Sequence, residues 1–321
     1  MMKLHKIIVA AALSFATLGA HAQESYPDRP IRMIIPFAAG GPADMVGREV
    51  AQLLSQELGQ TVVVANAGGG HGVPALNQLL GAPADGYTLL MPASGNMTIP
   101  SKAMEGKDVL NLLDPVSQVT QSPHVLVVSK SIPVTSVQEL IDYAKANPGK
   151  VNFGSAGVGG VAHLAMEMFK DQADVDVVHV PYRGTSKAVI DLGAGQVHAL
   201  FSSMPSLKPM IDRGAVTPIG MSAASSGSET SRLPVISEAG LPNLEYTTWY
   251  GVFAKKGTPQ DIIQKLNQAV AKVVANPELN KKFEPQGVEF VASTPEELAA
   301  LVRKDSAKWQ KIIADAGIVI E

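Results

Sequence analysis

The stretch IRMIIPFAAGGPAD, residues 31–44, decides the fold of this chain. Its first five residues are mostly β-branched and apolar, which predicts a buried strand. A glycine-rich turn follows, and a segment of helical period then runs from residue 44 to residue 58. A strand, a tight turn and a helix in this order are typical of a parallel α/β sheet.

The same order returns in the middle of the chain, in VNFGSAGVGGVAH, residues 151–163. Between and beyond these two turns, short apolar runs alternate with longer segments of helical period. We predict strands over 31–35, 61–65, 88–91, 125–128, 151–153, 177–180, 199–201 and 216–221. The intervening helices are expected over 44–58, 73–80, 137–146, 161–172 and 186–194, and two long helices follow Thr258-Pro259 and Thr294-Pro295. Residues 97–115 receive no assignment.

Two extended segments, 121–130 and 246–256, mark places where the chain changes lobe. Single cores stop growing near 250–300 residues, and the mature chain has about 300, so two lobes are expected. The first lobe then comprises residues 23–122 and 249–321, the second comprises 123–248, and a ligand cleft lies between them. Paired crossing segments form a hinge. A single large sheet remains the alternative.

The N-terminus has the build of a secretory signal peptide. Lys3 and Lys6 precede an apolar run, and the small residues of Ala20-His21-Ala22 form a cleavage site. The run is too short for a membrane span, which needs about 20 apolar residues. We therefore expect residues 1–22 to be removed near Ala22 and the mature protein to be periplasmic.

Composition excludes several classes of function. Without Lys3 and Lys6, 24 of the 26 basic residues remain against 29 acidic ones, a net charge of −5 that argues against nucleic acid as a partner. The absence of cysteine removes disulfides, thiolate catalysis and cysteine metal sites. No Walker loop, nucleophile elbow or histidine pair at zinc spacing occurs, so we expect neither a metal nor a cofactor. An exported enzyme with residues dispersed along the chain stays an alternative, because such a site leaves no local motif.

The two glycine turns are candidate anion sites. Glycine lets the backbone turn sharply with its amides open, and a helix N-terminus adds unpaired N–H groups with partial positive charge. Such a site can hold a carboxylate without any basic side chain. The alternative is that both turns are only tight connections. The second also matches a loose dinucleotide fingerprint, Gly157-x-Gly159-x-x-Ala162, but the acidic residue expected after the next strand is replaced by Pro181-Tyr182-Arg183.

Several ordered blocks resemble one known family. They are YPxRPIR (26–32), PFxxGGxxD (36–44), DGYTLL (85–90), HVPYRG (179–184) and EAGLP (238–242). Together they are similar to the Bug family, the TctC-type substrate-binding receptors of tripartite tricarboxylate transporters. The resemblance implies a periplasmic-binding-protein fold of type II, an α/β fold with two lobes of mostly parallel sheets that close on a ligand. It also implies a small organic carboxylate as ligand and membrane permease subunits as partners. A ligand sensor that presents its closed form to a membrane kinase is a further alternative, and we expect a monomer.

The resemblance also indicates which residues line the cleft. One ligand carboxylate would meet the amides of both turns, with Phe37 as an apolar wall, while Tyr182, Arg183, Ser202 and Ser203 face it from the other lobe. The full set of expected ligand-binding residues is Phe37, Gly41, Ala43, Asp44, Ser94, Gly95, Ser155, Ala156, Gly157, Gly160, His163, Tyr182, Arg183, Ser202 and Ser203. Arg183 either pairs with a second carboxylate or is an ordinary surface arginine. Asp44 either accepts from a ligand ammonium or stabilises the first turn of its own helix.

Two departures from the family pattern bear on the ligand. Ser202-Ser203 stands where relatives commonly have an acid followed by asparagine. Ala67-Gly68 replaces an Arg-Pro pair, and His71 appears in the same loop. Because an acidic partner for an amino group is missing, the sequence predicts a mono- or dicarboxylate without an ammonium group, aliphatic or aromatic.

Overall fold

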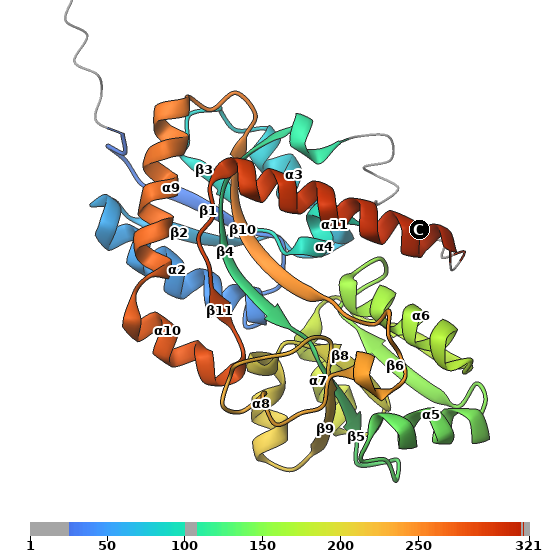
Figure 1. The fold of residues 1–321 in the computed structure, drawn as a ribbon. Helices are drawn as coiled ribbons and strands as arrows, with labels where there is room; N and C mark the ends of the chain where they lie inside the picture. Colours follow the sequence, from blue (N-terminus) through green and yellow to red (C-terminus); the bar gives the residue numbers. More distant parts are fainter. Residues whose placement is uncertain (1–25, 100–107, 316, 318–321) are drawn as a thin grey trace, which may run out of the picture.

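A computed structural model describes residues 26–99, 108–315 and 317. The predicted signal peptide lies outside these described residues. Within them, no helix combines the length and apolar character needed to cross a membrane. The described chain forms two sheets, each covered by helices on both faces (Figure 1).

The first lobe is built on a six-stranded sheet of order β11-β4-β10-β3-β1-β2. Its strands are β1 (Ile31–Ile35), β2 (Val62–Asn66), β3 (Thr88–Leu90), β4 (Leu113–Pro123), β10 (Thr247–Lys255) and β11 (Glu289–Phe290). One face packs against α2 (Pro42–Leu58), α9 (Gln260–Val274) and α10 (Pro277–Phe283). The other packs against α3 (Val73–Leu80), α4 (Ser94–Thr98) and α11 (Pro295–Asp315). Strand β1 is central and covered on both faces, which explains its nearly continuous apolar sequence.

The second lobe is built on a five-stranded sheet of order β7-β6-β8-β5-β9. Its strands are β5 (Val125–Ser129), β6 (Val151–Ser155), β7 (Val177–Pro181), β8 (Ala199–Ser202) and β9 (Val216–Met221). Helices α5 (Val137–Ala146) and α6 (Val161–Ala173) cover one face, and α7 (Thr185–Gly193) and α8 (Met204–Asp212) cover the other. Short 3₁₀ helices occur at Gly70–Gly72, Val109–Asn111, Ile236–Ala239 and Glu284–Gln286.

The expected two-lobe α/β architecture is confirmed, but the sheets are mixed rather than mostly parallel. Strand pairs β1–β2, β1–β3, β6–β7 and β6–β8 are parallel, whereas those made by β4, β5, β9, β10 and β11 are antiparallel. The antiparallel strands include the two that carry the chain from one lobe to the other. A strand that enters one lobe from the other runs antiparallel to strands of the βαβ units in that lobe. Where the boundary between the lobes falls along the chain stays a prediction.

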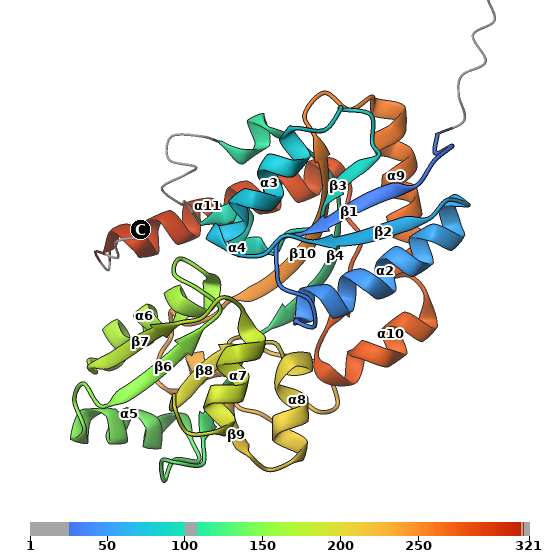
Figure 2. The same ribbon diagram turned by 180° about the vertical axis from the view of Figure 1, so that it is seen from behind.

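Besides the cleft, the described parts of the two lobes meet at the two chain crossings, at helix α11 and at one loop. Chain crossings lie between β4 and β5 and ahead of β10. Helix α11 reaches from the first lobe to the second (Figures 1 and 2). There its Trp309 joins the core cluster of α5 and α6. A loop of the second lobe also packs on residues 284–287 of the first. There Glu229 N–H donates to Pro285 O at 2.9 Å, and a Cβ on Gly227 would lie 2.5 Å from Glu284 O.

Candidate functional site

A cavity of about 980 Å³ lies between the two lobes. The first lobe lines it with the turns that follow β1, β2 and β3, and the second with those that follow β6, β7 and β8. In open α/β sheets, ligands bind at the carboxyl ends of the strands, where these turns lie. The volume is at the upper end of the usual range for small-molecule sites.

The β1–α2 turn is fixed by Asp44, which lies behind the cavity wall. Gly40 has φ 79°, and Gly41 then returns to extended backbone and starts α2. The Asp44 carboxylate accepts from Gly40 N–H, Arg48 Nε and Asn66 Nδ2, each at 2.9 Å. Burial by itself would raise the pKa of Asp44, but the three hydrogen bonds outweigh it and the pKa is lowered. The carboxylate therefore stays ionised and already accepts three hydrogen bonds from protein partners.

The β6–α6 turn is fixed in the same way by His163. Gly159 has φ 74°, Gly160 is extended and starts α6, and His163 Nδ1 accepts from Gly159 N–H at 3.1 Å. Burial lowers the pKa of His163, although the nearby Glu167 carboxylate opposes this. The ring is neutral, because an imidazolium has no acceptor nitrogen to offer.

A second histidine supports this turn from below. His179 stacks on His163 with ring centroids 4.0 Å apart, and its Nε2 lies 2.6 Å from Ser155 Oγ. That hydroxyl also bonds both the N–H and the carbonyl of Gly157. Burial, and then repulsion from His163, lowers the pKa of His179 to about 4. The stacked pair thus holds the whole turn in one conformation.

Five helices of eight or more residues begin at the cavity wall, and in none does the N-cap side chain accept from the first turn. They are α2 and α3 from the first lobe and α6, α7 and α8 from the second. Away from the cavity, α5, α10 and α11 are capped by Ser136, Asn276 and Thr294, whereas α9 follows Pro259 and has no side-chain cap. The first amides of a helix have no partner within it. At this cavity those amides remain available to a ligand.

The cavity wall has no acidic side chain among its described residues, whereas Arg183 and Lys187 contribute to it. Lys187 forms an ion pair with Asp191 at 2.7 Å. Arg183 is exposed and makes no ion pair or hydrogen bond with the described residues. The wall also carries the hydroxyls of Ser94 and Ser203, which are buried without a hydrogen-bond partner in the described structure. One serine comes from each lobe, so both sides offer a polar group as well as amides.

Twelve of the fifteen predicted site residues line the cavity together: Phe37, Gly41, Ala43, Ser94, Gly95, Ala156, Gly157, Gly160, Tyr182, Arg183, Ser202 and Ser203. The other three, Asp44, Ser155 and His163, lie behind the turns and hold them in place. For Asp44 this placement corresponds to the structural alternative. Whether the twelve contact a ligand stays a prediction.

Other lining residues were not predicted from the sequence, chiefly His71, Asn96, His124, Thr248 and Tyr250. His71 lies in the glycine loop after β2, with φ 53°, and its Nε2 donates to the carbonyls of Gly95 and Ile99 at 3.0 and 3.2 Å. The remaining residues come from α4 or the two chain crossings. The crossings were identified from the sequence, and a two-lobe fold necessarily places such segments at the base of the cleft, which is the signal that was overlooked.

The fold and the site define a two-lobe solute-binding protein. The family model of the tripartite tricarboxylate transporter family receptor, TctC, matches residues 46–318. The chain belongs to this family, which confirms the resemblance seen in its sequence. Protein BugT of Bordetella pertussis is 32% identical over 325 residues, covering 98% of this chain and 99% of BugT.

Solved structures agree. An R. palustris protein with adipate shares 34% identity and a TM-score of 0.86 over 91% of this chain and 98% of its own. The periplasmic binding protein BugD shares 30% identity and a TM-score of 0.85 over 91% and 99%. MatC of Rhodopseudomonas palustris, with bound malate, shares 27% identity and a TM-score of 0.83 over 90% and 100%. The family is described as a receptor family, and BugD as a periplasmic binding protein.

Proposed function

We propose that this protein is a periplasmic receptor that captures a small organic carboxylate between its lobes and delivers it to the membrane subunits of a tripartite tricarboxylate transporter. The ligand is a mono- or dicarboxylate without an ammonium group. The receptor acts as a monomer, and closure of the lobes presents the bound ligand to the permease.

The observation that carries this proposal is the convergence of uncapped helix N-termini on a cavity wall without acids. Unpaired amides and the positive end of the helix dipole favour an anion. Arg183 adds a cationic side chain that has no competing partner among the described residues. A carboxylate satisfies the amides from both lobes at once, so binding favours lobe closure.

The missing acid argues against an amino-acid ligand. A buried ammonium group needs an acceptor with negative charge. Asp44 is not among the residues that line the cavity, and it already accepts from Gly40, Arg48 and Asn66. Adipate and malate in the structural neighbours are both carboxylates without an amine, which supports the same class here.

The test is a thermal-shift and calorimetric screen of the mature protein. The panel contains succinate, adipate, malate, citrate, phthalate, benzoate and hexanoate, with glutamate as the amino acid and adipamide as an uncharged match for adipate. A ligand at 100 times its Kd stabilises the folded state by about 2.7 kcal/mol. We expect one or more amine-free acids to raise the melting temperature and adipamide to leave it unchanged.

Stabilisation by glutamate alone would contradict the proposed ligand class, and the absence of any shift would contradict the function itself. NMR of the best acid after incubation with the protein tests the enzymatic alternative. We expect its spectrum to remain unchanged, whereas conversion to a product would show catalysis.

A further inference from the structure

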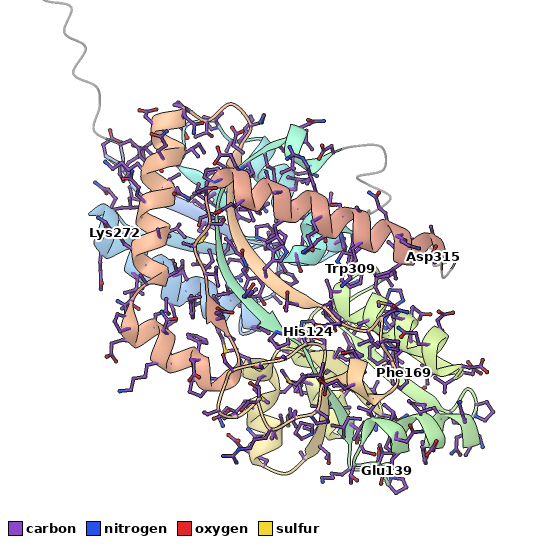
Figure 3. All side chains as sticks on the ribbon, in the orientation of Figure 1. His124, Glu139, Phe169, Lys272, Trp309 and Asp315 are labelled. Carbon is purple, nitrogen blue, oxygen red and sulfur yellow. The ribbon has the colours of Figure 1, made fainter. Side chains whose placement is uncertain are left out.

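His124 stands at the junction of the lobes, and the proposed function gives it no role. It lies between β4 and β5 on the first chain crossing, and its ring lines the cavity. Figure 3 shows His124 where the strand leaving the upper lobe enters the lower one. A side chain here is placed between the lobes and at the cavity, where it could contact a bound ligand.

The ring is held in place by the second crossing segment. His124 Nδ1 lies 3.2 Å from the hydroxyl of Tyr246, and the two rings meet edge to face with centroids 5.5 Å apart. Ser222 links the two segments through the main chain. Its hydroxyl accepts from His124 N–H at 2.8 Å and donates to Tyr246 O at 2.7 Å. The orientation of the imidazole is therefore fixed before any ligand arrives.

The position of the ring proton follows from these bonds. Burial lowers the pKa of His124 to about 4, so the ring is neutral and carries one N–H. The Ser222 hydroxyl is committed to the main chain, so the buried Tyr246 hydroxyl donates to Nδ1. The proton of the imidazole is then on Nε2. This nitrogen has no partner among the described residues and is not one of the fully enclosed polar atoms, and His124 is one of the residues that line the cavity.

We propose that His124 is a specificity-determining residue, whose Nε2–H donates to a ligand oxygen other than those of the carboxylate held by the glycine turns. This inference rests on the proposed carboxylate function. It names the ligand as an acid that carries a second oxygen group: a diacid, a hydroxy acid or an oxo acid. A hydrocarbon end would leave a desolvated N–H without a partner, which disfavours simple monoacids.

Tyr246 extends this contact away from the cavity. Its ring packs edge to face against Phe201, with centroids 6.2 Å apart, and against Trp309 of α11, with centroids 5.9 Å apart. Trp309, labelled in Figure 3, lies where α11 joins the two lobes. A ligand bonded to Nε2 is thereby linked through two rings to the outer side of the hinge, and Trp309 fluorescence can report its arrival.

The test uses pairs of acids that match in carbon number and differ in the second oxygen group: adipate with hexanoate, succinate with butyrate, and phthalate with benzoate. We expect the wild-type protein to bind the better diacid about tenfold to a hundredfold more tightly than its monoacid partner. His124→Phe should reduce this ratio to a few-fold, chiefly by weakening the diacid. His124→Gln, which retains an N–H donor, should restore part of it.

The ratio separates a contact with the ligand from a purely structural role, because damage to the fold weakens both acids of a pair alike. An unchanged ratio in a folded His124→Phe protein would overturn the inference while leaving the carboxylate function intact. If none of the six acids binds the wild-type protein, the proposed function fails first. Should His124→Phe not fold, Tyr246→Phe provides the second variant. This substitution keeps the aromatic ring but removes the hydroxyl that donates to Nδ1, so the imidazole proton of His124 is no longer held on Nε2. We expect the ratio of diacid to monoacid affinity to fall as in His124→Phe. An unchanged ratio would count against the inference.

Discussion

The two glycine turns share one backbone design and differ in one side chain. In Gly40-Gly41-Pro42-Ala43-Asp44 and in Gly159-Gly160-Val161-Ala162-His163, the first glycine has positive φ and the second starts a helix. In both, the third helical residue accepts from the N–H of the first glycine. The acceptor is a charged carboxylate in one lobe and a neutral imidazole in the other.

The difference shows that the geometry requires an acceptor, not a particular residue. In the first lobe, Asp44 remains an acceptor throughout the neutral and mildly acidic range because its pKa is lowered from an already acidic value by its hydrogen bonds. In the second lobe, His163 loses its acceptor nitrogen as soon as it binds a proton. The first turn is therefore resistant to acid, and the second is not.

The largest expected effect on ligand binding comes from an acidic side chain at the N-cap position of each glycine turn. Gly41→Asp and Gly160→Asp place a carboxylate where the ligand carboxylate should lie, so we expect carboxylate binding to weaken by more than about 100-fold. The fold should tolerate both changes, since neither glycine has positive φ and a new Cβ would lie 3.5 Å from its nearest neighbour. The new side chain can cap the helix and stabilise the unliganded protein by about 0.5 kcal/mol. Calorimetry and urea unfolding measure the two effects.

Gly41→Ala and Gly160→Ala are the matched controls, because they add the Cβ without the charge. We expect them to bind within about tenfold of the wild-type protein. Normal affinity in either aspartate variant would place the anion site elsewhere, and equal losses in the alanine and aspartate variants would attribute the effect to bulk.

Acid should destabilise the second lobe more than the first. Burial lowers the pKa values of His124 and His179 to about 4, so the unfolded chain takes up protons near pH 6.5 while the folded chain does not. Stability therefore falls as pH drops from about 6.5 towards 4, by up to about 1.4 kcal/mol per pH unit for His124 and by less for His179, whose partial exposure screens its interactions. Below that window the folded protein binds the protons too, and the loss levels off. Urea unfolding between pH 7.5 and 4.5 measures the slope.

Hydrogen exchange assigns the loss to a lobe. We expect the amides of residues 155–163 to lose protection before those of residues 37–44, since His163 and His179 face each other with Glu167 and Lys170 nearby. His179→Gln should flatten the pH slope. Simultaneous loss of protection in both turns would show that the histidine pair does not control the second.

The smallest expected effect concerns Asp44. Asp44→Asn retains an oxygen that can accept from Gly40 N–H and removes a negative charge close to the proposed anion site. Because Coulomb energies at this distance are partly screened, we expect amine-free acids to bind about two- to fivefold more tightly. Calorimetric titration with the best acid of the panel measures the change. A tenfold loss in a folded variant would mean that Asp44 contacts the ligand.

Much of the fold was predictable because most strands and helices have clean periodicity. The expected strand at residues 31–35 and helix at 137–146 match β1 and α5 residue for residue. Most of strand β4 was not predicted because its buried residues include polar ones, such as Ser117, Gln118 and Thr120. Their hydrogen bonds come from elements far along the chain, such as Ser293 O for the Ser117 hydroxyl, and no local pattern reveals them. Helix α8 was not predicted because Pro205 and Pro209 interrupt its helical sequence pattern.

The candidate site shows the same division between local and distant information. The glycine turns were recognisable because the strand, turn and helix that form each of them are contiguous. A structural role for Asp44 was one of the two alternatives that the sequence offered, but its partners and the supporting role of His163 were not predicted. The direction in which these side chains point depends on neighbours such as Asn66 and His179, which lie on other strands. Aligning the two turns on their paired glycines would have revealed the shared third helical position.

The proposed carboxylate site, made of main-chain amides, has a consequence for how ligand specificity changes among related receptors. Nearly every residue carries an amide, so most substitutions in the two turns change side chains without removing the donors. The side chains proposed to select the ligand, His124 and Arg183, lie outside the two turns and can vary independently of the main-chain amides. Inheritance can then preserve affinity for acids as a class while descendants exchange one acid for another. A duplicated copy of such a gene would retain the main-chain amides that bind a carboxylate and would need to change only the side chains that select the rest of the ligand.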